Sequence, residues 1–502
     1  MRTNRFITAL CIPLLLLSAC TQTAITDTRQ PASAGPKLTL QSRLDEILHR
    51  RDDADGTIKF AARVIDLETG KELYNNLPDE PFMPASNMKL PVSAAALDTF
   101  GADGTFDTHL ALNGADLWLI GTGDPALGDP AIEKKRGRVP TSVLDDWATA
   151  LLKRGVTQIK GDLVFDDGAF DEVRFNPHWS KGFHGDWYAA PVSGLNLNDN
   201  CVDVTIHPTT DGQPVSYTVM PPVNNIKIIN KAVTGGGTEA PSISRDADSN
   251  TYTITGNCTK PTELKSKSVV DPGEFFADAL RTRLELRGIT IAGETKRAQR
   301  TPGTSVIPAG AEVVATHKSA MPDVMWRINK SSQNMFADAL FKRMGKGAWE
   351  GGSDAVHAFL KKAAIDDTHY KVVDGSGLSR ENRVTARLMT DLLAYMAKHP
   401  EAETFRQSMS AAGVDGTLRN RMHDLKGRVQ AKTGYIGGVR GLSGYVQKSD
   451  GKWLAFSIIF NGFKGSERPF ELLQDEAVHV LADLPKVRPS TRPTTRPTRA
   501  AR

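Results

Sequence analysis

The sequence contains few of the patterns on which metal, phosphate or esterase chemistry depends. Its eleven histidines are scattered without the H-E-x-x-H spacing of a zinc peptidase. No serine lies in a G-x-S-x-G pattern, which argues against an α/β-hydrolase nucleophile. The run Gly121–Asp124 lacks the lysine and serine of a phosphate-binding loop and is expected to form a turn. We therefore expect no metal and no cofactor.

No apolar run is long enough to cross a membrane. Phe6–Leu17 falls short of the roughly 20 residues that a spanning helix needs. Two arginines precede it, and Leu-Ser-Ala leads into Cys20, so residues 1–19 are expected to be a secretory signal peptide. This end resembles a bacterial lipobox, which would make Cys20 the lipidated first residue of an exported, periplasm-facing protein. Thr21 after Cys20 favours anchoring in the outer membrane over the inner membrane. The alternative to lipidation is plain signal cleavage that leaves Cys20 with a free thiol.

Cysteine is also scarce, with only four residues in the chain. Removing Cys11 with the signal and assigning Cys20 to lipid leaves Cys201 and Cys258. In an oxidising compartment these two could form a disulfide if their Cα atoms come close enough. Two buried, unpaired thiols are the alternative, and the sequence leaves both open.

The formal charge of +4 does not indicate a nucleic-acid partner. Residues 486–502 carry six basic side chains and no acidic one, and the signal carries two more, so the remaining chain is net negative. The segment 486–502 is a Pro/Thr/Arg repeat without apolar residues and is expected to be disordered. It could touch anionic wall polymer or lipid head groups, or remain solvated. Residues 20–36 are expected to form a flexible tether.

Apolar periodicity divides the rest of the chain into two kinds of segment. Toward both ends, strand and helix patterns predict an α+β fold, with one antiparallel sheet covered by helices. The predicted strands are Thr57–Asp66, a return from Leu73, Arg428–Tyr435, Leu442–Val446 and Trp453–Phe460, and the predicted helices are Val92–Leu97, Asp323–Gly345 and Thr385–Met396. Residues 105–302 instead contain short β-rich runs and one predicted helix, Pro272–Leu286.

Three short motifs carry most of the functional information. In chain order they are S-x-x-K, S-x-N and K-T-G, at Ser86–Lys89, Ser332–Asn334 and Lys432–Gly434. This order is typical of serine acyl-transferases that react with penicillin and use a lysine to activate the nucleophile. A second S-x-x-K at Ser449–Lys452 shows that the spacing also arises by chance, whereas S-x-N and K-T-G each occur once.

The interval between the first two motifs predicts an insertion. About 250 residues separate Ser86 from Ser332, far more than a loop within a compact domain needs. We therefore expect a discontinuous catalytic domain, residues 37–104 and 303–485, around a β-rich insertion at residues 105–302. A tandem arrangement is the alternative, but it would separate the nucleophile from its partners.

Ser86 is the expected nucleophile and Lys89 the expected general base. A serine hydroxyl needs a base within hydrogen-bond reach, and residues three apart at a helix start share a face. Burial and a neighbouring cation, Lys432, would lower the pKa of Lys89 and favour the neutral amine. The alternative is an unrelated surface Ser–Lys pair, which the two partner motifs disfavour. Pro91 follows Lys89 closely and is expected to remove one helix hydrogen bond and to kink the helix.

The S-x-N motif is expected to serve the leaving group and the substrate backbone. Ser332 would relay a proton between Lys89 and the leaving amine, and the Asn334 amide would hold a substrate carbonyl. Ser331 is a rival hydroxyl, but its distance from Asn334 in the sequence does not fit the motif.

The K-T-G motif is expected to bind the end of the substrate. Lys432 and Thr433 suit a carboxylate, and Gly434 would let the substrate chain approach the strand edge. The backbone N–H groups of Ser86 and Tyr435 would form an oxyanion hole, a donor pair that stabilises the transition state. A glycine-punctuated hairpin without a binding role is the alternative.

From Leu38 to Leu484 the chain resembles the low-molecular-mass class C penicillin-binding proteins, the D-alanyl-D-alanine carboxypeptidase/endopeptidase family. Beyond the three motifs, the resemblance rests on three segments, Ala190–Asn200, Asp374–Arg380 and Gly413–Leu418. It implies a penicillin-binding, serine β-lactamase-like transpeptidase core with two nested insert domains, the smaller at about residues 200–260. Asp374–Arg380 could border the active site or only turn the chain.

The resemblance implies cleavage of D-Ala-D-Ala stem peptides of peptidoglycan through an acyl-enzyme at Ser86, inhibition by β-lactams, and no cofactor. It also places Asp186 where some members hold the amino end of the stem peptide's diamino acid. A β-lactamase is the nearest alternative, which the long insertion disfavours. An inactive, wall-binding lipoprotein is a second alternative, which the complete motifs disfavour. The oligomeric state is left open.

Overall fold

The computed structural model describes residues 39–299 and 301–484. The expected signal peptide 1–19, the lipidated Cys20, the tether 20–36 and the basic segment 486–502 lie outside these residues. Among the residues described, no helix is long and apolar enough to cross a membrane.

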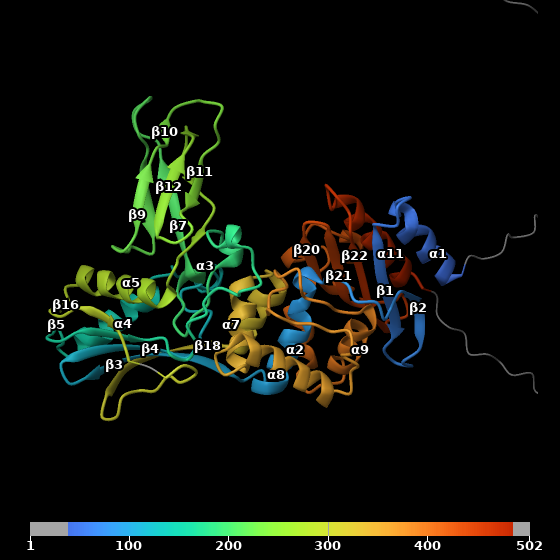
Figure 1. Cartoon of the computed structure of the whole chain (residues 1–502), viewed down its shortest axis with the longest axis horizontal. Coiled ribbons are helices and arrows are strands. Elements are labelled where there is room, and N and C mark those ends of the chain that lie inside the picture. Colours follow the sequence, from blue (N-terminus) through green and yellow to red (C-terminus); the bar gives the residue numbers. More distant parts are fainter. Residues whose placement is uncertain (1–38, 300, 485–502) are drawn as a thin grey trace, which may run out of the picture. The chain divides into compact units, whose positions relative to one another are not determined.

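The two ends of the chain build one six-stranded antiparallel sheet (Figure 1). Its order is β19-β20-β21-β22-β1-β2. The strands are β1 (Lys59–Asp66), β2 (Glu72–Asn76), β19 (Ser410–Ala411), β20 (Val429–Ile436), β21 (Val439–Gln447) and β22 (Trp453–Asn461). Strand β1 pairs with β22 along its whole length, from Lys59 opposite Asn461 to Asp66 opposite Leu454. The N-terminal hairpin is therefore an integral part of a sheet whose other strands lie near the C-terminus.

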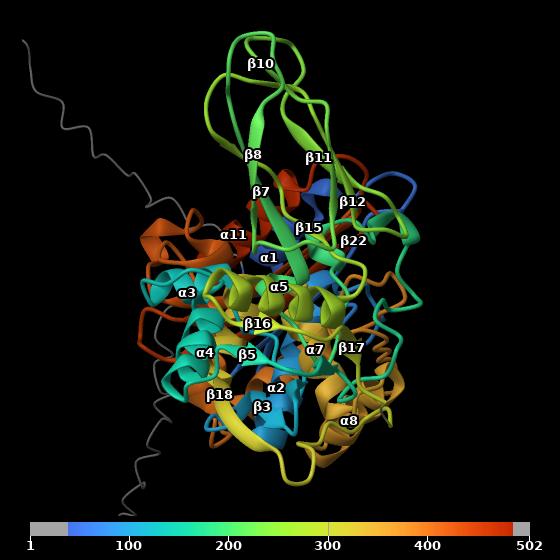
Figure 2. The ribbon, with the colours of Figure 1, turned by 90° about the vertical axis from the view of Figure 1, so that its left-hand side faces the viewer.

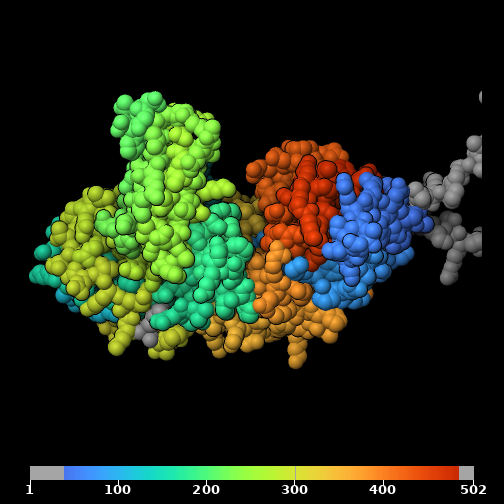
Figure 3. Space-filling view, turned by 45° about the horizontal axis from the view of Figure 1, so that its top comes forward, coloured from blue at the N-terminus to red at the C-terminus, as the bar shows by residue number. Residues whose placement is uncertain are grey.

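Helices bury both faces of this sheet. Alternate residues of a strand point to opposite faces, and β1 shows this directly. The helices of this part are α1 (Leu40–Leu48), α2 (Lys89–Phe100), α6 (Met321–Met325), α7 (Asn334–Met344), α8 (Trp349–Lys362), α9 (Ala386–Met396), α10 (Ala402–Ser408) and α11 (Arg468–Ala482). On β1, Phe60, Ala62 and Val64 pack in the apolar cluster of α1 and α11, whereas Ala61 and Ile65 pack in the cluster of α2, α7 and α9. Figure 3 shows the N-terminal segment in blue beside the C-terminal segment in red.

A second sheet of five strands is built from the intervening residues, in the order β17-β6-β4-β3-β18. Its strands are β3 (Thr105–Asn113), β4 (Asp116–Gly121), β6 (Leu163–Asp166), β17 (Thr295–Arg297) and β18 (Glu312–Ala320), with α3 (Pro130–Lys135), α4 (Ser142–Lys153), α5 (Pro272–Leu286), β5 (Gln158–Ile159) and β16 (Thr290–Ile291) nearby. Because β18 pairs with β3, this sheet extends to Ala320, past the predicted limit at residue 302. The rest of the predicted domain division stays a prediction.

Short strands between residues 201 and 268 form a third group (Figures 1 and 2). One sheet contains β7 (Cys201–His207), β8 (Ser216–Met220), β14 (Thr262–Glu263) and β15 (Lys267–Ser268). Another contains β9 (Lys227–Asn230), β11 (Ser242–Arg245) and β12 (Thr251–Thr255), and a two-stranded pair contains β10 (Val233–Thr234) and β13 (Asn257–Cys258).

The two described cysteines are not paired. Cys201 and Cys258 are both buried, free thiols, so a disulfide between them is not present. They belong to different apolar clusters, Cys201 to that of α2 and α7 and Cys258 to that of α4 and α5. Each thiol lies near a backbone carbonyl instead, that of Asp199 at 3.4 Å and that of Lys260 at 2.9 Å. The structure thus agrees with the alternative of two buried thiols.

Candidate active site

Ser86 lies in a 3₁₀ turn, Ala85–Met88, that runs directly into α2. Ala85 before it has φ +46°, a left-handed conformation that is strained for a residue with a Cβ atom. Gly377 packs directly against this turn, because a Cβ atom at Gly377 would lie only 1.9 Å from the Ala85 carbonyl oxygen. Pro91 falls in the first turn of α2, and the helix continues to Phe100. Pro91 does not interrupt the helix, because N–H groups of the first turn have no intrahelical partner to lose. The expected kink stays a prediction.

The Lys89 ammonium or amine group contacts three oxygens. Its Nζ lies 3.0 Å from Ser86 Oγ, 2.7 Å from Asn334 Oδ1 and 2.6 Å from the carbonyl of Ser376. The side chain is fully buried, and this burial lowers the pKa of Lys89 to about 8 although Asp338 and Asp374 raise it. About a tenth of Lys89 is therefore neutral at pH 7, roughly 300-fold more than of a lysine with the ordinary pKa, and only this form can act as a base.

The S-x-N motif joins the end of a π-helical turn, Trp326–Lys330, to the start of α7. Ser332 has φ +61°, again a left-handed residue, and its Oγ accepts a hydrogen bond of 2.8 Å from Lys432 Nζ. Asn334 accepts from Lys89 and donates through Nδ2 to the carbonyl of Tyr188 at 2.7 Å. The three motifs are thus joined by direct side-chain contacts.

The K-T-G motif lies on β20 beside the nucleophile turn. Lys432 is fully buried, and burial lowers its pKa well below the ordinary value, with Lys89 and Arg440 pushing the same way. Thr433 Oγ1 donates to Thr417 Oγ1 at 2.8 Å. The sequence did not single out Thr417 itself, although it belongs to the segment Gly413–Leu418 on which the resemblance rested.

Gly434 lies against the turn that carries Ser86. A Cβ atom there would lie 2.6 Å from the Pro84 carbonyl oxygen and 3.2 Å from the Asn87 nitrogen. The missing side chain therefore lets β20 pack directly against this turn. The approach of a substrate chain to the strand edge at Gly434 stays a prediction.

A cavity of about 440 Å³ opens over Ser86. Its lining comes from the nucleophile turn, the S-x-N loop, the end of β20, the 183–188 segment and the segment after Asp374. The lining residues are Ser86, Phe183, Trp187, Tyr188, Ser331, Ser332, Asn334, Gly377, Leu378, Arg380, Tyr435, Ile436 and Gly437. Asp374–Arg380 therefore borders the site. Arg380 is fixed there by a 2.6 Å hydrogen bond from its Nη2 to the carbonyl of Gly437.

Asp186 does not line this cavity. Its Oδ1 accepts from Lys267 Nζ at 2.6 Å, and its Oδ2 accepts from the Tyr188 hydroxyl at 2.8 Å. Both carboxylate oxygens are thus already engaged within the chain. A role for Asp186 in holding a substrate amine stays a prediction.

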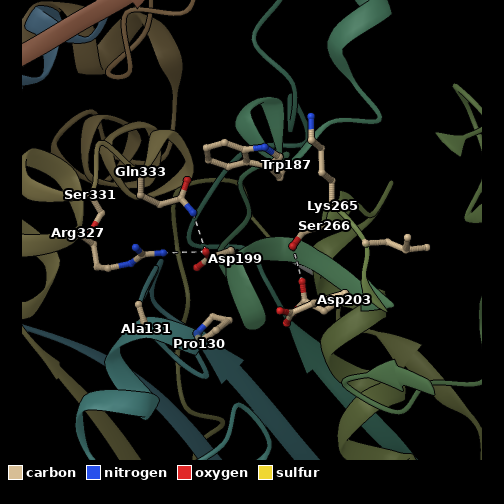
Figure 4. A pocket seen from close by; sticks show the side chains of 12 residues that line it. Pro130, Ala131, Trp187, Asp199, Asp203, Lys265, Ser266, Arg327, Ser331 and Gln333 are labelled. Carbon is tan, nitrogen blue, oxygen red and sulfur yellow. Dashed lines mark hydrogen bonds and ion pairs between the residues drawn. The ribbon is translucent and has the colours of Figure 1, made fainter. Parts of the chain in front are cut away.

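A neighbouring pocket of about 550 Å³ shares Trp187 and Ser331 with the cavity (Figure 4). At its wall, Asp199 Oδ2 accepts from Gln333 Nε2 at 2.6 Å and from Arg327 Nη2 at 3.0 Å. Gln333, the middle residue of the S-x-N motif, also accepts through Oε1 from the Asn334 N–H at 2.9 Å. The loop with the strained Ser332 is therefore anchored to Asp199.

Within residues 39–299 and 301–484, no three His, Cys, Asp or Glu side chains come together as metal ligands. In the part of the chain that the structure describes, the polar groups around Ser86 Oγ are hydroxyl, amine, amide and backbone groups. Such a set suits acyl transfer through a serine ester.

Comparison with known proteins agrees with this geometry. The model of the D-Ala-D-Ala carboxypeptidase 3 (S13) family matches residues 40–482. The chain is 33% identical over 515 residues to the D-alanyl-D-alanine carboxypeptidase of Actinomadura sp. (strain R39), covering 95% of this chain and 90% of that protein. It is 27% identical over 406 residues to the D-alanyl-D-alanine carboxypeptidase DacB of Haemophilus influenzae, covering 76% and 81%.

A solved structure has a similar fold. Penicillin-binding protein 4 (dacB) from Haemophilus influenzae superimposes with a TM-score of 0.73 at 23% identity, over 88% of this chain and 99% of that one. The predicted penicillin-binding α+β fold is confirmed by this likeness. With a family model that spans nearly all described residues, the chain belongs to the D-Ala-D-Ala carboxypeptidase 3 (S13) family.

Proposed function

We propose that this chain, a serine-type D-Ala-D-Ala carboxypeptidase, cleaves peptidoglycan stem peptides through an acyl-enzyme at Ser86. The observation that carries the assignment is the 3.0 Å contact between Ser86 Oγ and the buried Lys89 Nζ. The lowered pKa of Lys89 makes its amine available as a base.

In the first step, neutral Lys89 takes the proton of Ser86, and the Oγ atom attacks the carbonyl carbon of the penultimate D-Ala. The backbone N–H groups of Ser86 and Tyr435 donate to the oxyanion that forms. Removing one such donor typically costs about 2.7–4 kcal/mol of transition-state stabilisation. The C–N bond then breaks, and the proton that Lys89 took from Ser86 passes through Ser332 to the leaving amine, which restores neutral Lys89.

The departing D-Ala carries a carboxylate, for which Lys432 and Thr433 are the proposed partners. Lys432 already contacts Ser332, and the next residue, Thr433, contacts Thr417, so one amino group and three hydroxyl groups are available there. A bound carboxylate favours the charged form of Lys432 against the effect of burial. Water then hydrolyses the acyl-ester and regenerates Ser86.

On the acyl side, we propose that the stem peptide lies in the cavity lined by the exposed aromatic rings of Phe183, Trp187 and Tyr435. The resemblance assigned the amino end of its diamino acid to Asp186. Lys267 and the Tyr188 hydroxyl each donate to one oxygen of Asp186, so the substrate amine would either join these donors at the carboxylate or replace Lys267 there.

β-Lactams are the proposed inhibitors, because they acylate the same serine. The Haemophilus influenzae penicillin-binding protein 4 has been solved with a β-lactam bound. A β-lactamase would use the same acylation machinery but release the adduct quickly, and an inactive wall-binding protein would form no adduct. The formation of the adduct and its lifetime together therefore separate the three alternatives.

Export and lipid anchoring at Cys20 are proposed from the sequence pattern alone. We propose that the protein is a lipoprotein that faces the periplasm and is anchored in the outer rather than the inner membrane. Metabolic labelling with radioactive palmitate should label the wild-type protein and not Cys20→Ser. Equal labelling of both proteins would contradict lipidation at this cysteine.

The activity is tested with two substrates. Fluorescent penicillin should give a stable adduct with the wild type and none with Ser86→Ala, and a pentapeptide ending in D-Ala-D-Ala should lose one D-Ala. Rapid penicillin turnover would favour the lactamase alternative. Digestion of purified cross-linked wall fragments, resolved by mass, measures how much endopeptidase activity accompanies the carboxypeptidase.

A further inference from the structure

Asp338 is a buried carboxylate that the proposed mechanism does not use. It lies on α7 four residues after Asn334, so the two side chains share a helix face. Its side chain is fully buried, and its Oδ1 accepts from the backbone N–H groups of Gly375 at 2.8 Å and Ser376 at 3.0 Å. Its Oδ2 is buried without a hydrogen-bond partner in this structure. A carboxylate in such a place is costly, which makes a purely structural role a poor explanation.

One residue links this carboxylate to the catalytic lysine. The N–H of Ser376 donates to Asp338, and the carbonyl of Ser376 accepts from Lys89 Nζ at 2.6 Å. One turn earlier on α7, Asn334 Oδ1 accepts from the same amine at 2.7 Å. Helix α7 therefore positions Lys89 twice, directly through Asn334 and indirectly through Asp338.

Electrostatic interactions also connect Asp338 with Lys89. Among the charged groups, Asp338 has the largest effect on the pKa of Lys89 and raises it, followed by Asp374. Lys432 is the neighbouring cation, and its own pKa is lowered by Lys89. Burial and Asp374 together hold the pKa of Asp338 well above its ordinary value although Lys89 lowers it, and Lys342 on the same helix also faces it. A proton gained by Lys89 therefore favours the ionised form of Asp338, which is then the strongest counter-charge beside the Lys89 ammonium.

We propose that Asp338 is a positioning residue for acylation, which fixes the Ser376 carbonyl against Lys89 and balances the ammonium formed when Lys89 takes the proton of Ser86. The proton moves from Oγ to Nζ, and Asp338 exchanges no atoms. This inference rests on the proposed roles of Ser86 and Lys89.

Two variants separate the position of the Ser376 carbonyl from the charge. Asp338→Asn keeps an acceptor oxygen for both N–H groups but loses the charge, whereas Asp338→Ala loses both. The measurement is the second-order rate constant for acylation by a chromogenic cephalosporin, followed by stopped flow from about pH 5 to pH 10. For Asp338→Asn the midpoint of the rising limb should move down by roughly one pH unit, because a negative charge that raises the pKa of Lys89 is gone. Its maximal rate should fall roughly ten-fold or more, and Asp338→Ala should be slower still.

Asp124→Asn is the matched control. Asp124 is also a buried carboxylate that accepts from a backbone N–H group, that of Ala126 at 2.9 Å, and it contacts neither Lys89 nor Ser376, so the rate and midpoint of Asp124→Asn should equal those of the wild type. Melting curves of all variants report folding, and the isosteric asparagine carries the test if the alanine variant does not fold.

An unchanged rate and midpoint for Asp338→Asn would overturn the proposal. So would a loss of rate with an unmoved midpoint, or a midpoint that moves up, because neither follows from removing a charge that balances Lys89. Ser86→Ala and the wild type keep the two proposals distinguishable. If the wild type is not acylated at all, it is the proposed function that fails.

Discussion

Gly434→Ala should slow the acylation of Ser86, because the added methyl group collides with the turn that carries the nucleophile. Its Cβ would lie 2.6 Å from the Pro84 carbonyl oxygen, whereas ordinary contact begins at 3.4 Å, so strand and turn must separate by about 0.8 Å. Both groups are backbone, so no side chain can rotate away. Overpacking of this kind costs roughly 1–3 kcal/mol of unfolding free energy. A displacement near 1 Å at a reacting group typically lowers the rate roughly 100-fold.

Stopped-flow acylation and thermal melting measure these two effects separately. Gly236→Ala is the matched control, because Gly236 has no heavy atom within 4 Å of the added Cβ and no positive φ, and it should match the wild type in both assays. A folded Gly434→Ala protein that is acylated at the wild-type rate would refute the reasoning that close packing of β20 positions Ser86.

Three further predictions concern other parts of the site and the core. The acylation rate should rise with pH through about 8, because Lys89 is a base only when neutral and its pKa is lowered to about 8; a rate constant that is flat between about pH 6 and pH 10 contradicts this role. Gln333→Ala should lower the free energy of unfolding by about 1.5–3 kcal/mol, measured by urea unfolding, and should slow acylation, because the hydrogen bond from Gln333 to Asp199 anchors the strained loop of Ser332. Gln407→Ala, at an exposed glutamine, is its control. Equal stability and equal acylation rates of the two variants would contradict the anchoring role of Gln333. Cys201 and Cys258 should both react with a thiol reagent only after unfolding, because both are buried and free; denatured, unreduced protein in which neither thiol reacts would instead indicate a disulfide.

The catalytic motifs could be read from the sequence because each is a local spacing with its own chemistry. Ser86 and Lys89 are three residues apart, and a helix start brings them together whatever the rest of the chain does. One sheet built from both chain ends is also a prediction of the alternating apolar runs, although the pairing of β1 with β22 is not. That the three motifs lie together in space follows from their shared chemistry, and the contacts from Lys89 to Asn334 and from Lys432 to Ser332 agree with this.

Other features depend on contacts that no local pattern encodes. The Ser376 carbonyl and the Tyr188 carbonyl are backbone groups, which every residue possesses, so the sequence cannot mark them. Asp338 had a weak signal, its position one helical turn after Asn334, but an aspartate on a helix is usually exposed. The limit of the insertion was placed too early because β18 pairs with β3 across about 200 residues. Burial of Cys201 and Cys258 in separate clusters likewise depends on the whole fold.

Acylation of Ser86 is tested most directly by peptide mapping with mass spectrometry after brief exposure of the protein to benzylpenicillin. We predict a single penicilloyl adduct on the peptide that contains Ser86. An adduct on Ser449, the serine of the second S-x-x-K sequence, or a folded protein without any adduct, would contradict the account.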